Sequence, residues 1–111
     1  MITRHLYAEF ECDFDTLNDE DRLIGSCVNA CVEAGATVLS FQSKKFDPQG
    51  VTVLILLSES HLSLHTWPER KTAALDIFTC GDHTFPTKGY EYLLKELNAT
   101  ECGYSLVRRP V

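Results

Sequence analysis

Side chains suited to nucleophilic and acid–base chemistry are concentrated in the stretch SESHLSLHTWPE, from Ser58 to Glu69. It contains a Glu-Ser-His triplet and two histidines, His61 and His65. It also follows directly on VTVLILL, residues 51–57, the most apolar run in the chain. A hydroxyl, carboxylates and imidazoles beside a buried strand are the groups that covalent and general acid–base catalysis use.

The spacing of these residues predicts that they lie on a sheet surface. Residues 61–67 alternate in polarity as a half-buried strand does, and Pro68 ends the run. Residues 72–80, TAALDIFTC, are expected to form the next strand, joined to the first through a turn at 68–71. One face then carries His61, Ser63, His65 and Trp67 from the first strand and Ala74, Asp76, Phe78 and Cys80 from the second. A hairpin pairing would therefore put His65 and Cys80 on the same surface.

Two helices and four further strands are predicted around this hairpin. Alternation predicts strands over residues 2–10, 36–46, 51–57 and 101–108, with Leu6, Ala8 and Phe10 facing inward and VTVLILL buried on nearly all sides. The turn DPQG separates the second of these strands from the third. The element order β-α-β-β-β-β-α-β favours an α+β fold, a two-layer sandwich with a mainly antiparallel sheet and two helices on one face.

The helices are identified by their period and their end signals. The first lies between Asp15 and Gly35, with Asn18 as its cap and Gly35 as its end. Its buried stripe is Leu23, Ile24, Cys27, Val28, Cys31 and Val32. The second opens at Pro86, and its inner face holds Tyr90, Leu93, Leu94 and Leu97.

Size and composition limit the classes of function. A chain of 111 residues predicts one domain, residues 1–111, with a modest core that dimerisation would extend. A net charge of −6 without a Lys/Arg run argues against nucleic-acid binding. The longest apolar run is too short to span a bilayer, and no signal-like stretch opens the chain, so we expect a cytoplasmic protein that does not bind membranes. Its five cysteines are expected to be free thiols.

Metal binding and hydrolysis are the alternatives for the cysteines and histidines. Cys27 and Cys31 have the i, i+4 spacing of a ligand pair, but they lie on an apolar stripe, which favours core packing. His61 and His65 are four residues apart, roughly 13 Å along a strand, and no zinc-binding spacing is present. A Cys-His hydrolase would need a strand-turn-helix nucleophile elbow that the sequence lacks. We therefore expect no metal.

Three short blocks, ESH, HTWPE and FTCG, follow one another within PQGVTVLILLSESHLSLHTWPE and AALDIFTCGD. In these blocks the chain resembles the small prokaryotic S-adenosylmethionine decarboxylase proenzymes, and the likeness runs from RHLYAEF through AGATV to FTCGDHTFP. The resemblance implies self-cleavage between Glu59 and Ser60 into a beta chain, 1–59, and an alpha chain, 60–111. It further implies that Ser60 becomes a covalent pyruvoyl cofactor, which forms a Schiff base with the substrate amine.

The same resemblance implies a role for each matching residue. His65 matches the histidine that removes the α-proton during processing, and Thr52 stands where the family has a processing hydroxyl, commonly a serine. Cys80 matches the proton donor of the decarboxylation. The substrate-binding positions are Phe46, which would stack on adenine, and Glu69, which would accept the ribose hydroxyls, with Trp67 as a second aromatic candidate for the same pocket.

The implied activity is decarboxylation of S-adenosylmethionine to supply aminopropyl groups for spermidine synthesis. Homodimers are implied as well, with αββα layers and, after cleavage, two alpha and two beta chains, so that Phe46 would serve a site built mainly by the partner chain. One alternative is a pyruvoyl-dependent ornithine or arginine decarboxylase on the same fold, against which Phe46 and Glu69 argue. Another is a non-catalytic partner homologue, against which the set of Ser60, His65 and Cys80 argues.

Overall fold

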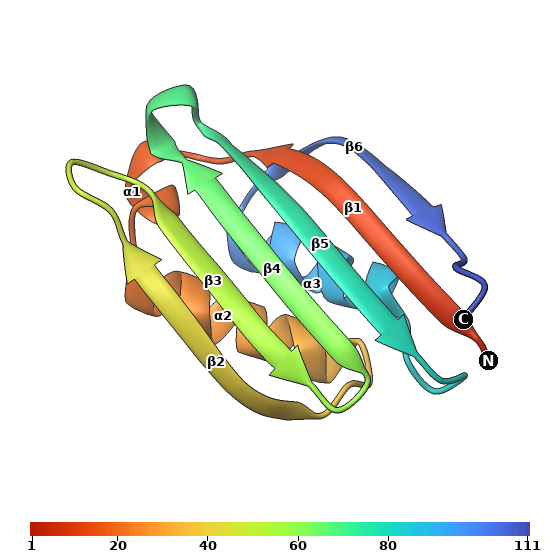
Figure 1. Cartoon of the computed structure of the whole chain (residues 1–111). Coiled ribbons are helices and arrows are strands. Elements are labelled where there is room, and N and C mark those ends of the chain that lie inside the picture. Colours follow the sequence, from red (N-terminus) through yellow and green to blue (C-terminus); the bar gives the residue numbers. More distant parts are fainter.

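The computed structural model describes residues 1–111 and shows an antiparallel sheet of six strands with two main helices on one face (Figure 1). The strands are β1 (Thr3–Glu11), β2 (Val38–Lys45), β3 (Val51–Leu57), β4 (Ser60–Trp67), β5 (Thr72–Cys80) and β6 (Thr100–Val107). The helices are α1 (Phe14–Leu17), α2 (Glu20–Glu33) and α3 (Pro86–Glu96), and the short 3-10 helix η1 (Pro68–Arg70) joins β4 to β5. Neighbouring strands follow the order β2-β3-β4-β5-β1-β6. The predicted α+β architecture is confirmed.

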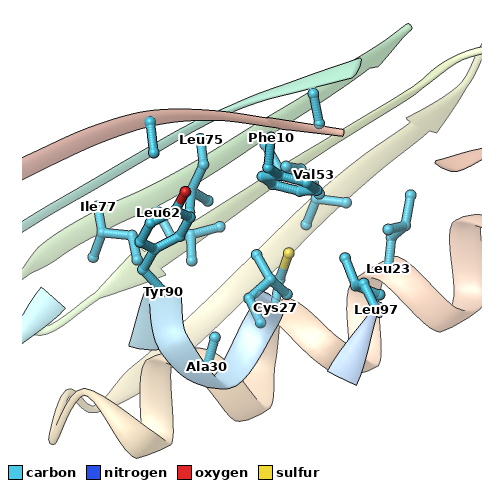
Figure 2. Packing of buried hydrophobic residues seen from close by; sticks show 14 of the residues in the cluster. Phe10, Leu23, Cys27, Ala30, Val53, Leu62, Leu75, Ile77, Tyr90 and Leu97 are labelled. Atoms are coloured by element: carbon cyan, nitrogen blue, oxygen red, sulfur yellow. The ribbon is translucent and has the colours of Figure 1, made fainter. Parts of the chain in front are cut away.

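The core lies between the sheet and helices α2 and α3 (Figure 2). Leu6, Ala8 and Phe10 are completely buried there, as their alternation along β1 predicts. Cys27 and Cys31 are core residues too, and burial raises the pKa of both thiols, that of Cys31 to about 12. These two thiols therefore stay neutral. None of the helices is long and apolar enough to cross a membrane.

The start of the long helix differs from the prediction. Asp19, not Asn18, caps α2, because its carboxylate accepts the backbone N–H of Arg22 at 3.1 Å. Asn18 instead follows the short helix α1, which the sequence pattern did not predict. At the other end the prediction is confirmed: Gly35 has φ 83°, a left-handed conformation that glycine adopts without strain.

Two predictions of burial are wrong in part. Within β3, Leu54 and Leu56 are 45% and 54% exposed, while the alternate residues of the strand are buried. The physical reason is that helices cover only one face of the sheet, so the outward side chains of a central strand remain open. On α2, Val32 is 61% exposed, because it turns away from both the sheet and α3 at the last turn of the helix.

Gly89 marks the closest approach between α2 and α3. A Cβ at this position would lie 2.7 Å from the Ala30 carbonyl oxygen and 3.3 Å from Ala34 Cβ. Gly89→Ala is therefore expected to lower the free energy of unfolding by about 1–2 kcal/mol, since overpacking outweighs the gain in helix propensity. Gly25 is the matched control: it lies in α2, and a Cβ added there would meet no other atom within 4 Å.

Gly25→Ala should raise the free energy of unfolding by up to about 1 kcal/mol, the propensity gain alone. Urea unfolding of the two single variants measures both values. Equal stabilisation by both substitutions would show that the helices do not approach each other closely at Gly89.

Candidate active site

The strands β4 and β5 form the predicted hairpin, and their polar residues share the uncovered face of the sheet. Ser63 pairs with Asp76, and His65 pairs with Ala74. Cys80 lies on the same face as His65, as period two predicts. Cys80 is, however, six positions beyond Ala74, the partner of His65, and the two positions are about 20 Å apart along β5. The predicted site residues therefore occupy two separate ends of the hairpin.

The first end holds the Glu59–Ser60 peptide. Ser60 has φ 145°, a region that is strained for any residue with a Cβ. The carbonyl oxygen of Glu59 accepts a hydrogen bond from the backbone N–H of Cys80 at 3.0 Å. That donor polarises the carbonyl and would stabilise negative charge developing on its oxygen during attack by a neighbouring hydroxyl.

The side chain of Glu59 is anchored as firmly as its carbonyl. Its carboxylate accepts hydrogen bonds from the Thr37 N–H at 2.9 Å, from the Thr37 hydroxyl at 3.4 Å and from His83 Nε2 at 3.0 Å. Two hydrogen bonds hold the pKa of the Glu59 carboxyl below its usual value. The one from the Thr37 N–H has the larger effect, and the one from His83 has the next largest. Sequence reasoning missed both partners, because Thr37 and His83 are distant along the chain; the only signal was the histidine in FTCGDH.

The second end, near the start of β3 and the end of β4, brings five of the predicted residues together. The Thr52 hydroxyl and His65 Nδ1 are 3.0 Å apart, within hydrogen-bonding distance. Both residues line a hollow of about 320 Å³, at the lower end of the range for small-molecule sites. The other predicted residues on its wall are Phe46, Trp67 and Glu69.

A tight turn positions Phe46 at this hollow. The Phe46 N–H donates to the Gly50 carbonyl at 2.8 Å, which closes residues 46–50 into a turn. The Gly50 N–H in turn donates to Asn18 Oδ1 at 3.0 Å, which ties the turn to the segment between α1 and α2. Gly50 has φ 109°, which explains the glycine at this position.

Between the two ends, the middle of the open face is partly apolar. A hollow of about 600 Å³ there is lined by residues that include Leu54, Leu56, His61 and Ser63. On the neighbouring strands, His5 Nε2 lies 3.6 Å from Asp76 Oδ2. An apolar patch rimmed by polar groups is typical of a surface that another protein covers.

Distance decides what one chain can do with these groups. Ser60 and His65 are five positions apart on β4, about 17 Å, so His65 cannot reach the α-carbon of Ser60 in its own chain. No group of three or more His, Cys, Asp or Glu residues is arranged to hold a metal ion. One chain thus presents a strained, polarised peptide at one end and an imidazole with a substrate-sized hollow at the other.

The comparisons with known proteins agree with each other. The family model described as S-adenosylmethionine decarboxylase matches residues 4–110. Proteins named S-adenosylmethionine decarboxylase proenzyme are similar to this chain. One from Synechococcus sp. (strain WH7803) is 49% identical over 89% of this chain and 78% of its own length. One from Brevibacillus brevis is 55% identical over 85% of this chain and 71% of its own length.

A solved structure shows the same fold. The crystal structure of the adenosylmethionine decarboxylase from Aquifex aeolicus matches with a TM-score of 0.83 and 28% sequence identity. The match covers 97% of this chain and 88% of the other. The similarity therefore extends over both ends of the β4–β5 hairpin.

Proposed function

The chain belongs to the S-adenosylmethionine decarboxylase family and is an S-adenosylmethionine decarboxylase; on this premise we propose that its pyruvoyl group derives from Ser60 and that two chains build each active site. The observation that carries the first part is the peptide at the 59–60 junction. It combines a φ of 145° at Ser60 with a Glu59 carbonyl that accepts the Cys80 N–H. The product, decarboxylated S-adenosylmethionine, is an aminopropyl donor for spermidine synthesis.

Self-cleavage starts at the Ser60 hydroxyl. Its oxygen attacks the Glu59 carbonyl carbon, the C–N bond breaks, and the amide becomes an ester. A base then removes the α-proton of residue 60, and the ester oxygen leaves Cβ by elimination as the new C-terminal main-chain carboxylate of Glu59. The dehydroalanine that remains tautomerises, takes up water and releases ammonia. Backbone strain at Ser60 offsets part of the cost of exchanging an amide for a less stable ester.

His65 is the base that the proposal assigns to the elimination. An imidazole can accept a proton near neutral pH, and the hydrogen bond with the Thr52 hydroxyl orients the ring. Since His65 lies about 17 Å from Ser60 in its own chain, the base must come from a second copy. The open face supplies the surface for this pairing, because its exposed Leu54 and Leu56 would be buried against a partner sheet.

A two-fold axis near the middle of β3 and β4 satisfies this requirement. Such an axis makes the interface isologous, so the Ser60 end of one chain faces the His65 end of its partner, and two identical sites form. The layers would then follow the order αββα, with the helices outside. Cleavage of both chains would give two alpha and two beta chains.

The residues at the second end fit the substrate proposed for them. Phe46 and Trp67 offer aromatic faces to the adenine ring and to the sulfonium charge. The Glu69 carboxylate can accept hydrogen bonds from both ribose hydroxyls. The pyruvoyl group supplies a carbonyl that takes up the electrons released when carbon dioxide leaves. The Cys80 thiol, at the Ser60 end of the same composite site, then protonates the α-carbon of the product.

Carbon dioxide release tests the substrate directly. Purified cleaved protein is given carboxyl-labelled S-adenosylmethionine, ornithine or arginine in parallel, and released label is counted. We expect release from S-adenosylmethionine alone, because the other two amino acids have no adenosine to occupy the hollow around Phe46 and Glu69. Release from ornithine or arginine with none from S-adenosylmethionine would overturn the substrate assignment.

Cys80→Ala is expected to separate cleavage from turnover. The group that contacts the Glu59 carbonyl is the backbone N–H of Cys80, which alanine retains, so the variant should still be cleaved. Loss of the proton donor should lower the turnover number by about 100-fold or more. Cys102→Ala, at an exposed cysteine on β6, is the control and should leave both quantities unchanged. Full turnover in the Cys80 variant would remove the proton-donor assignment.

A further inference from the structure

His83 has no role in the chemistry proposed for Ser60, His65 and Cys80, yet its ring touches the residue at which the chain is cut. Its Nε2 atom lies 3.0 Å from Glu59 Oε2. A carboxylate can only accept hydrogen bonds, so the proton of this bond is on Nε2. The Glu59 side chain is only 12% exposed although its partner His83 is 58% exposed. The Glu59 side chain is therefore mostly covered, while the imidazole that contacts it faces solvent.

The backbone around His83 leaves room for the imidazole in this place. A Cβ on Gly81 would lie 2.7 Å from His83 Cε1, so only glycine leaves room for the ring. A Cβ on Gly35 would lie 2.5 Å from the His83 carbonyl oxygen, which shows how closely the end of α2 approaches the same residue. Both glycines have positive φ, 95° and 83°. Gly81 thus leaves space for the imidazole, and the approach of Gly35 fixes the position of the His83 backbone.

Three chain segments meet at Glu59: its own turn, the residues before β2, and the end of β5 with the loop after it. Thr37, just before β2, donates two hydrogen bonds to the Glu59 carboxylate. The Ser58 N–H donates to the Thr37 carbonyl at 2.9 Å. Cys80, at the end of β5, donates to its carbonyl, and His83 donates to its carboxylate. A strained backbone persists only where the surroundings determine it fully, and these contacts surround the Ser60 φ of 145°.

We propose that His83 is a positioning residue for self-cleavage: its hydrogen bond to the Glu59 carboxylate helps to hold the Glu59–Ser60 peptide where the Ser60 hydroxyl can attack. This inference rests on the proposed cleavage of that peptide. The role is distinct from that of His65, which acts as a base from the partner chain. Because small misplacements of reacting atoms are costly, loss of the contact should slow cleavage about 10- to 100-fold.

Two substitutions at position 83 isolate the hydrogen bond from the shape of the side chain. His83→Phe keeps a planar ring but has no donor, and His83→Gln keeps an N–H donor. Freshly synthesised chains are followed by intact mass over time, and the first-order rate of cleavage is fitted. We expect the slowing in His83→Phe and rates near wild type in His83→Gln. Asp82→Ala, an exposed neighbour, is the matched control and should cleave like wild type.

A double-mutant cycle then asks whether His83 acts through Glu59. Glu59→Ala removes the acceptor, so adding His83→Phe to it should cause no further slowing. The Tm of each variant is measured in the uncut Ser60→Ala background, where equal values show that folding is unaffected. The positioning role alone would be overturned if His83→Phe were cleaved at the wild-type rate. It would also be overturned if His83→Phe slowed cleavage equally in the wild-type and Glu59→Ala backgrounds. An uncut wild-type chain would overturn the proposed function and this role with it.

Discussion

Ser60→Ala is expected to yield a single full-length chain of 111 residues that releases no measurable carbon dioxide from S-adenosylmethionine. Alanine lacks the hydroxyl that attacks the Glu59 carbonyl, so neither the ester nor the pyruvoyl group can form. Denaturing gel electrophoresis or an intact mass measures the chain, and label release measures the activity. The loss should be complete, because the hydroxyl supplies both the nucleophile for cleavage and the leaving group whose elimination creates the cofactor.

Ser58→Ala is the matched control for this result. Ser58 is exposed in the turn that directly precedes Ser60, and its hydrogen bond to Thr37 is made by its backbone N–H, which alanine retains. This variant should cleave and turn over like wild type. Two fragments and full activity from the Ser60 variant would show that another residue supplies the nucleophile.

His65→Ala is expected to block cleavage when expressed alone and to be rescued by a partner that is itself inactive. In a hybrid with a Ser60→Ala chain, one site combines Ser60 of the first chain with His65 of the second, and that site is complete. With equal amounts of the two chains and random pairing, roughly half of the His65→Ala chains should be cut, because two-fold symmetry gives each hybrid one complete site. Different tags on the two chains show which one is cleaved.

The control for this experiment replaces the helper chain by the double variant Ser60→Ala/His65→Ala. No complete site can form in that pairing, so the His65→Ala chain should stay uncut. If it stays uncut with both helpers, the base acts within one chain, and the geometry that separates the two ends by about 17 Å must change before cleavage. Cleavage of His65→Ala on its own would remove the role of His65.

Much of the fold could be predicted because the strands alternate regularly. The two-residue alternation of side chains along a strand correctly predicted that His65, Trp67 and Cys80 lie on one face, since each strand is regular over that span. It could not tell how far apart His65 and Cys80 are, because that distance depends on register, and the face alone does not give it. The exposure of Leu54 and Leu56 was missed for a related reason: an apolar run does not show which face is left uncovered.

The candidate site was predictable only in part, and from resemblance more than from pattern. No periodicity assigns a role to Thr52 or Phe46, yet the structure places both at one hollow with His65. The anchoring of Glu59 by Thr37 and His83 is a tertiary contact between distant segments, so local rules give no sign of it. The positive φ of Ser60 could not be predicted either, because a serine between two predicted strands gives no sign of this backbone conformation.

An intact mass spectrum of purified wild-type protein tests most directly whether the chain breaks its own backbone at Ser60. The account predicts two polypeptides, 1–59 with the mass of the unmodified peptide and 60–111 lighter than its unmodified peptide by one ammonia. A single polypeptide of full length, or a cut chain whose second fragment still begins with an intact serine, would contradict it.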